Sequence, residues 1–480
     1  MHKTLLLKGM SGCALSVFLL STAHLARAQS SVDILKDEII VTATKKAGGE
    51  NVQDVPISIT AYGADQLNAL QVRDIAGLSF KMPNVALDDI GTARGTANFA
   101  IRGLGVNSSI PSIDPAVGVF VDGMYLGING GVIFDTFDLE SIEVLRGPQG
   151  VLFGRNVTGG AVLINTADPS YEKSIKGKFA VESGLRGSGI NSYAMGSVTG
   201  PIIEDKLAAK LAVYYNKDKG WFKNILPTGG TEDFGESETF IVRPSVTFDA
   251  GFFGNFILKF EHGESNGDGP AGQSHRNGSG VDGQIVNFSR ESFDLSIDER
   301  GLTDVNWNQF IGESNMDVSF GNGTITSIFT WREFNQAGTS DIDSTPAFLF
   351  HADFETDQTQ KSNELRYSGR FNDNLDVTAG LYYFQQDIDY AEGRRILGGA
   401  LTQDGGGVQD HRTYGIFAQF DYDVNDQFSV NAGIRYTDEK KDVTVASLFA
   451  NTNSPCNIID GTCPFDFTDS IKFTNWAPTV

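Results

Sequence analysis

Histidine is scarce in this chain of 480 residues, which has only six histidines. Two of them, His2 and His24, lie near the N-terminus. The other four are scattered through the second half of the chain: His262, His275, His351 and His411. None of these histidines shows metal-ligand spacing with another histidine or a cysteine. The sequence therefore predicts no metal site. It also shows no nucleophile–base pair and no phosphate-binding loop, so we expect neither an enzyme nor a bound cofactor.

Long apolar runs are also lacking. The run from Cys13 to Leu20 is much shorter than the ~20 residues that a membrane-spanning helix needs. Lys3 and Lys8 precede this run, and Ala26–Ala28 follows it as a small-x-small cleavage site. This pattern predicts a secretory signal peptide over residues 1–28. The remaining chain therefore either is soluble or crosses a membrane as a β-barrel.

Cysteine is rarer than tryptophan, with three cysteines against four tryptophans. Cys13 lies in the predicted signal peptide. Cys456 and Cys463 flank a polar loop in a chain that is expected to be exported, and exported thiols are oxidised. We predict a local disulfide between them. The alternative, a metal site, lacks a second cysteine pair or a histidine cluster nearby.

Positive charge is in short supply, with 37 basic against 60 acidic residues and a net charge of −23. This balance argues against a nucleic-acid partner, because phosphate backbones attract basic surfaces. What the chain has in abundance is glycine (55) and phenylalanine (34). This combination favours a β-dominated fold of many strands and turns.

The most informative stretch runs from Asp138 to Thr166. It holds two strand patterns, at 142–145 and 161–164, around a glycine-rich segment bracketed by Arg146 and Arg155. The stretch closely resembles the end of the plug domain of TonB-dependent outer-membrane receptors. Further segments resemble that domain in the same order: VPISIT (55–60), MPNV (82–85), IRG (101–103), GVFVDG (118–123) and EVLRGPQG (143–150). Residues 51–167 form one compact unit by pattern, with short helices expected at 64–70 and 72–78, and the resemblance implies that this unit is an α+β plug domain.

A β-prone run lies between the signal peptide and the plug, in the segment 29–50. Ile39 to Thr42 are β-branched and favour an extended chain, and Lys45, Lys46 and two glycines follow. We therefore expect this run to be exposed and unpaired, although an ordinary first strand has the same pattern. It resembles a TonB box (38–43). The resemblance implies main-chain pairing with the periplasmic TonB energy transducer through these residues: Glu38, Ile39, Ile40, Val41, Thr42 and Ala43.

From about Ile175 to Val480 the chain alternates in strand-length runs. Over 207–216, one face is apolar and ends in Tyr215, whereas the other carries Lys210. Arg243 takes a similar place in the run 240–248. A soluble sandwich has the same period, but long polar loops, expected at 263–306 and 335–357, alternate with tight turns such as 321–323. This pattern predicts the N-terminal part of an antiparallel transmembrane β-barrel over 175–480.

About twelve strands are expected in that region. A twelve-stranded barrel leaves a lumen of roughly 14 Å, whereas a plug of ~115 residues is about 34 Å across. About 22 strands, the number the family implies, leave roughly 34 Å. We therefore expect the plug to belong inside a 22-stranded barrel, of which this sequence holds roughly the first 12 strands.

The resemblance implies a monomeric importer in the outer membrane, in contact with lipid, that takes up a scarce large ligand, most often an iron chelate. Vitamin B12, a sugar or another nutrient could be imported by the same machinery. A signalling receptor usually carries an extra domain before the TonB box, and only eight residues lie between Gln29 and Asp37. A passive porin needs neither plug nor box.

Two plug arginines, Arg102 and Arg146, are expected to be buried in ion pairs that hold the plug in place. Their candidate partners are Glu143 and lumen-facing barrel acids such as Glu364. In the alternative, both arginines only fasten plug loops. Five residues are candidates for contacting the ligand: Tyr125, His275, Arg276, Phe348 and His351.

Overall fold

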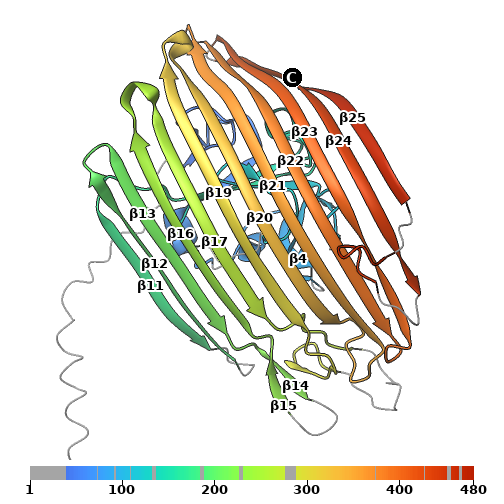
Figure 1. Cartoon of the computed structure of the whole chain (residues 1–480). Helices are drawn as coiled ribbons and strands as arrows, with labels where there is room; N and C mark the ends of the chain where they lie inside the picture. Colours follow the sequence, from blue (N-terminus) through green and yellow to red (C-terminus); the bar gives the residue numbers. More distant parts are fainter. Residues whose placement is uncertain are drawn as a thin grey trace, which may run out of the picture. The chain divides into compact units, whose positions relative to one another are not determined.

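A computed structural model gives the fold of the chain (Figure 1). It describes residues 39–72, 74–90, 93–108, 110–131, 137–183, 189–225, 231–275, 288–372, 374–425, 427–450, 456–463 and 467–479. The predicted signal peptide (1–28), Glu38 and Arg276 lie outside these residues. Within the described ranges, no helix combines the length and the apolar character needed to cross a bilayer.

The largest element is an antiparallel sheet of 12 strands, paired in the order β11-β12-β13-β16-β17-β19-β20-β21-β22-β23-β24-β25 (Figure 1). Its strands are β11 (Ser174–Ser183), β12 (Ile190–Ile203), β13 (Leu207–Asp218), β16 (Ser237–Asp249), β17 (Asn255–Gly267), β19 (Leu302–Val318), β20 (Gly323–Asp341), β21 (Phe350–Phe371), β22 (Leu375–Ile396), β23 (Leu401–Asn425), β24 (Phe428–Ala450) and β25 (Phe467–Thr479). The number of strands expected from the sequence is confirmed.

The two faces of this sheet differ as the alternation predicts. In β13, Lys210 and Tyr214 are buried, whereas Leu211 and Tyr215 on the opposite face are exposed. Large apolar side chains recur on the exposed face along the sheet: Phe179, Phe240, Phe260, Phe329, Leu365, Leu381, Ile416 and Phe420. An outward apolar face with a polar inner face is typical of a sheet whose outer side meets lipid.

The two edges at which strands connect also differ. At the short-turn edge, tight turns join neighbouring strands, for example η2 (Gly251–Phe253) and η3 (Phe320–Asn322). At the long-loop edge the connections include 268–301, 342–349 and 397–400. The connections 219–236 and 268–301 contribute a small sheet of β15 (Thr231–Phe234), β14 (Phe222–Ile225) and β18 (Asp294–Leu295).

The expected loop bounds at the long-loop edge are wrong. The segments predicted as loops at 263–306 and 335–357 begin and end in strand, because β17 runs to Gly267, β19 starts at Leu302, β20 runs to Asp341 and β21 starts at Phe350. In these stretches the backbone ladder continues although the side chains are polar. A strand that extends beyond the apolar band no longer needs apolar residues, so the sequence pattern stops before the strand does.

The plug is built on a second sheet of five strands. Its order is β3 (Ile59–Gly63), β9 (Leu139–Arg146), β10 (Gly160–Thr166), β7 (Val117–Val121) and β8 (Met124–Tyr125). Only the pairing of β10 with β7 is parallel among these neighbours. Both strands are apolar along nearly their whole length because both of their faces are buried.

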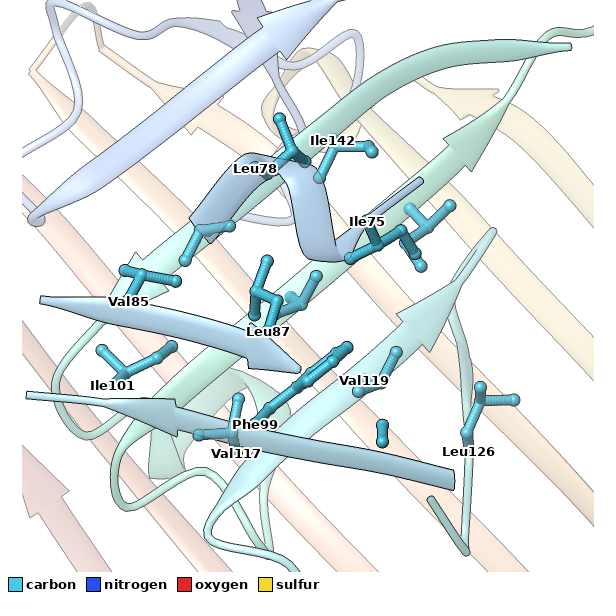
Figure 2. Close-up of a cluster of buried hydrophobic side chains, with 14 of the residues drawn as sticks. Ile75, Leu78, Val85, Leu87, Phe99, Ile101, Val117, Val119, Leu126 and Ile142 are labelled. Carbon is cyan, nitrogen blue, oxygen red and sulfur yellow. The ribbon is translucent and has the colours of Figure 1, made fainter. Parts of the chain in front are cut away.

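A hydrophobic core fills the space between this sheet and a smaller one, formed by β4 (Val85–Ile90), β5 (Ala93–Ile101) and β6 (Leu104–Gly105) (Figure 2). Leu87 and Ile101 of the small sheet pack in one cluster with Ile142 of β9. Ile311 and Ile328 of the large sheet belong to the same cluster. The plug and the large sheet therefore share a core.

The plug also contains three short helical segments, α1, η1 and α2. α1 (Ala64–Ala69) lies where a helix is predicted. The second predicted helix, 72–78, is instead the 3-10 turn η1 (Ala76–Phe80). The carboxylate of Asp74 accepts a hydrogen bond from the Gly77 amide at 2.6 Å, which places the turn later in the chain. α2 (Gly150–Phe153), in the glycine-rich stretch, is a helical turn that the sequence pattern does not predict.

The expected disulfide between Cys456 and Cys463 is present. It closes the polar loop between β24 and β25 at the long-loop edge, and both cysteines pack with Ile458.

Candidate functional site

The segment that carries the predicted box is docked against the plug. β1 (Ile40–Val41) pairs antiparallel with β2 (Glu50–Asn51). Val41 is 0% exposed and Ala43 is 1% exposed. The expectation that this segment is exposed and unpaired is therefore wrong. The chain folds back on itself at Gly49, whose φ of 71° suits glycine and where a Cβ would lie 2.5 Å from the β1 side chain.

Glu143 of β9 holds this segment. Its side chain is completely buried, and its carboxylate accepts hydrogen bonds from the Thr42 amide (2.9 Å), the Thr42 hydroxyl (3.0 Å) and the Ala43 amide (3.1 Å). The side-chain amide of Asn165 donates a further hydrogen bond at 3.1 Å. Burial raises the pKa of Glu143, and these donors oppose the shift. Two main-chain amides of the box therefore bind a side chain and not another strand.

Lys45 joins the same segment to the large sheet. Its ammonium group lies 2.6 Å from the carboxylate of Glu364 on β21 and over the rings of Phe153 and Phe417. Burial lowers the pKa of Lys45 to about 8, although the charge of Glu364 opposes this shift. Below that pH the lysine is charged and the ion pair is formed.

Lys46 makes a second connection, at the short-turn edge of the sheet. Its ammonium group lies 2.8 Å from Glu50 and 3.1 Å from both Asp376 and Asp421. Burial would lower the pKa of Lys46, but the hydrogen bond to Glu50 and the charge of Asp421 outweigh it, so the pKa is raised. Sequence reasoning missed both lysines as site residues. Two consecutive lysines after a β-prone run in an acidic chain are the signal that was available.

The expected ion pairs of the plug arginines are not formed with described carboxylates. Arg102 is exposed and donates to the Ser58 hydroxyl at 3.2 Å. Arg146 is half-buried and donates to the Thr60 hydroxyl at 2.7 Å. The prediction that both are buried against Glu143 or Glu364 is therefore wrong. Both arginines instead fasten plug segments to one another, as in the alternative interpretation.

The physical reason lies in the two acids. Glu143 already accepts hydrogen bonds from Thr42, Ala43 and Asn165. Glu364 is shared between Lys45 and Arg366, whose guanidinium lies 2.8 Å away. Glu364 does face the plug from the large sheet, but its plug-side partner is Lys45.

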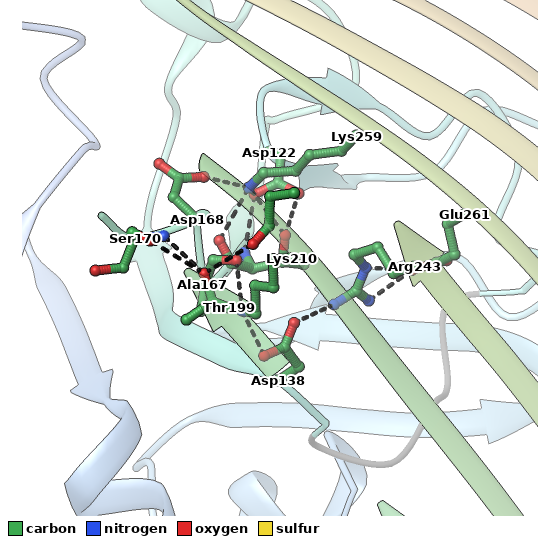
Figure 3. A network of polar contacts seen from close by, with 12 residues as sticks. Asp122, Asp138, Ala167, Asp168, Ser170, Thr199, Lys210, Arg243, Lys259 and Glu261 are labelled. Carbon is green, nitrogen blue, oxygen red and sulfur yellow. Dashed lines mark hydrogen bonds and ion pairs between the residues drawn. The ribbon is translucent and has the colours of Figure 1, made fainter. Parts of the chain in front are cut away.

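Other cations of the large sheet reach into the plug (Figure 3). Lys259 of β17 lies 3.1 Å from Asp122 and 2.7 Å from Asp168, and donates to the Thr166 carbonyl at 3.0 Å. Lys259, Asp122 and Thr166 are largely buried, whereas Asp168 is partly exposed. This one ammonium group therefore ties the end of the plug sheet to β17 of the large sheet.

A second cluster in Figure 3 centres on Asp138, the residue immediately before β9. Lys210 of β13 lies 2.6 Å from its carboxylate, and Arg243 of β16 lies 3.4 Å from it. Arg243 also donates from Nε to Glu261 at 2.7 Å. The sequence places Lys210 and Arg243 on the polar face, but the partner they share, Asp138, lies in a plug connection, which no strand period locates.

Tyr125 does not face an outer ligand. It is 3% exposed, its ring packs against Phe120 and Phe384, and its hydroxyl accepts a hydrogen bond from Asn156 at 2.7 Å. Burial raises the pKa of Tyr125 to about 12. In this arrangement of the plug Tyr125 is therefore not accessible from outside, and its contact with the ligand stays a prediction. Close by, Arg155 pairs with Asp114.

Three predicted ligand contacts lie at the long-loop edge. His275 is exposed and hydrogen-bonds the Phe288 carbonyl at 2.7 Å. The rings of Phe348 and His351 stack at 4.0 Å. His351 also lies 3.0 Å from Asp298. The structure therefore brings Phe348 and His351 together.

Two family models match the chain. A model described as "TonB-dependent Receptor Plug Domain" matches residues 51–161. A model described as "TonB dependent receptor-like, beta-barrel" matches residues 207–479. The first covers the five-stranded sheet except most of β10, and the second covers most of the 12-stranded sheet.

Curated relatives match a part of the chain. The chain is 29% identical over 214 residues to the pesticin receptor of Yersinia pestis, and this alignment covers 44% of this chain and 29% of that protein. It is 29% identical over 190 residues to the ferrioxamine B receptor of Salmonella typhimurium, covering 37% and 25%. The alignments thus span less than a third of these relatives' lengths.

Solved structures share the fold. The ferric yersiniabactin uptake receptor FyuA from Yersinia pestis superimposes with a TM-score of 0.69 at 18% identity, over 88% of this chain and 61% of that one. The siderophore receptor PiuA from Acinetobacter baumannii gives a TM-score of 0.65 at 13% identity, over 89% and 62%. The likeness covers both the plug and the large sheet.

Proposed function

Because this chain belongs to the TonB-dependent receptor family, an outer-membrane family, we propose that it serves TonB-energised uptake of a scarce large ligand, namely a ferric siderophore. The observation that carries this proposal is the docked box. The segment from Ile39 to Ala43 is held by side-chain contacts to the plug and, through the lysines after it, to the large sheet. Such a segment can be released without unfolding either sheet.

The proposed energy-coupling step is strand exchange. In the docked state β1 pairs with β2 over only two residues, and the amides of Thr42 and Ala43 bind Glu143. A periplasmic strand that adds to this segment supplies main-chain acceptors to replace the carboxylate. Pulling on the paired segment then transmits force to Glu143, which lies on β9 between β3 and β10 of the plug sheet.

The docked position also links the transducer to the barrel wall. Lys45 and Lys46 bind acids of β21, β22 and β23. Release of the segment breaks these ion pairs, so plug movement and release are coupled. The ligand class is proposed from relatives, whose names are those of a ferrioxamine B receptor and a ferric yersiniabactin receptor.

Uptake of radiolabelled ferric siderophores in a host that lacks its own copy of the gene tests the proposal. The gene carrying Ile40→Pro should lose uptake because proline removes a main-chain donor from the box. Ile40→Ala is the matched control and should retain uptake, because pairing uses the main chain and Ile40 is already 47% exposed. Equal uptake by both variants would refute the transducer step. If the uptake of every ferric siderophore in a panel is independent of the gene, the proposed ligand class is refuted.

A further inference from the structure

Three possible metal ligands from separate segments meet at the long-loop edge. Asp298 lies in the connection before β19, Asp341 ends β20 and His351 is the second residue of β21. One ligand atom from each lies within 4.8 Å of the other two. Asp341 and His351 are opposite one another in the β20–β21 ladder, and His351 Nε2 lies 3.0 Å from Asp298 Oδ1.

Asp341 gives an independent indication of a missing partner. Asp341 is buried, with 6% of its surface exposed. Oδ1 accepts a hydrogen bond from the Ser344 amide at 2.8 Å, but Oδ2 is buried and has no hydrogen-bond partner among the described residues. A buried carboxylate oxygen without a donor is costly. The nearby carboxylate of Asp343 cannot help, because it is negative and accepts from the amides of Leu349 and Phe350.

We propose that Asp298, Asp341 and His351 bind one divalent transition-metal ion of the Zn²⁺ type. The donors are one imidazole nitrogen and two carboxylates, a set that suits Zn²⁺ and its neighbours better than Ca²⁺ or Mg²⁺, which take oxygen ligands only. Metal–ligand bonds of about 2.1 Å place neighbouring ligand atoms roughly 3.0–3.4 Å apart. The distance of 3.0 Å between His351 Nε2 and Asp298 Oδ1 already lies in this range. One ligand atom from each of the three residues lies within 4.8 Å of the other two, so side-chain rotation alone is needed to bring all three to bonding distance from one ion.

The surroundings orient the ligands. The Ser344 amide fixes the Asp341 carboxylate. The ring of Phe348 stacks on the imidazole of His351 at 4.0 Å with an interplanar angle of 10°, which holds the ring plane. On binding, the metal replaces the proton shared between His351 and Asp298. The ion then ties the loop 342–349 to the segment before β19. This inference does not rest on the proposed transport function.

The test is a Zn²⁺ titration of the purified full chain in detergent after removal of metals with a chelator. Calorimetry should show one Zn²⁺ per chain, and Asp341→Asn or His351→Gln should weaken its binding about tenfold or more. His275→Gln is the matched control, because His275 is also at the long-loop edge and exposed, and should leave the affinity unchanged. Ca²⁺ should bind much more weakly than Zn²⁺.

A spectroscopic signature separates this site from adventitious binding. Cu²⁺ in the same site should show hyperfine coupling to one imidazole nitrogen by electron paramagnetic resonance, and His351→Gln should abolish it. Asp298→Asn changes an exposed side chain and should weaken binding without altering the fold. Zn²⁺ binding that is unchanged in both His351→Gln and Asp298→Asn, or absent from the wild-type chain, would overturn the proposal.

Discussion

Glu143 is the residue on which docking of the box depends most. In Glu143→Gln the charged carboxylate that accepts hydrogen bonds from the Thr42 and Ala43 amides becomes a neutral amide. The NH2 group of that side chain is a donor and cannot accept a hydrogen bond from a main-chain amide. Each charged hydrogen bond contributes about 1.5–3 kcal/mol. We therefore expect the box to be released about ten times more often. A cysteine in place of the buried Val41 reports this release as a faster rate of maleimide labelling.

Glu140→Gln is the control for this experiment, because Glu140 lies on the same strand and is exposed. It should leave the labelling rate as it is in the Val41→Cys parent. If Glu143→Gln and Glu140→Gln label equally fast, the carboxylate does not hold the box.

Lys45 makes docking depend on pH. Its pKa is lowered from 10.5 to about 8 in the docked segment, so between these values the docked state binds fewer protons than the released state. Docking therefore strengthens as pH rises from about 8 towards 10.5, by at most about 1.4 kcal/mol per pH unit. A spin label at exposed position 40 should show a falling mobile fraction over this range. In Lys45→Met the mobile fraction should no longer change with pH. An equally steep change with pH in that variant would show that Lys45 is not the group responsible.

At the scale of elements, the short β1–β2 pair keeps the box in its docked position. Val41 and Glu50 are opposite one another in its antiparallel register. Opposite residues in such a pair have Cα atoms about 4.5–5.5 Å apart, which a disulfide can bridge. Cysteines at both positions should therefore form a disulfide that abolishes binding of the purified periplasmic domain of TonB, with recovery after reduction.

Each single cysteine variant serves as a control and should bind the TonB domain with and without reductant. Undiminished binding by the oxidised double variant would mean that β1 need not leave β2.

Most elements were predictable because their signals are local. The alternation of β13, the apolar runs of β7 and β10 and the turn at Gly321 depend on neighbours in sequence. The predicted loops failed where strands continue into water, since a polar strand has no apolar period. The docking of β1 was missed because its partner carboxylate lies on β9, about a hundred residues away.

At the scale of the whole molecule, the sequence identified the two parts but not the contacts between them. It placed Lys210 and Arg243 on the inner face, yet their acidic partner Asp138 lies in a plug connection. Arg102 and Arg146 were expected to form the ion pairs that hold the plug. In the structure Lys45, Lys210 and Lys259 form ion pairs between the plug and the large sheet instead. Which cation meets which acid depends on how the plug is rotated against the sheet, and no local pattern contains that rotation.

Retention of the plug should therefore depend on Lys259 more than on Arg146. Lys259→Met leaves Asp122 without its cation next to Thr166 in a buried setting, and breaking a buried pair costs about 3–5 kcal/mol. The plug should become protease-sensitive at a lower urea concentration than in the wild-type chain. Arg146→Ala removes only a hydrogen bond to Thr60 within the plug, so its shift should be smaller.

Lys217→Met is the matched control, because Lys217 is also an ion-paired lysine of the large sheet but its partner Glu238 lies on the same sheet and the pair is open to solvent. Screening by water makes such a pair weak, so the urea dependence should match that of the wild-type chain. If Lys259→Met behaves like Lys217→Met while Arg146→Ala releases the plug, the plug is retained by its own arginines, and the ion pairs with the large sheet only accompany the docking.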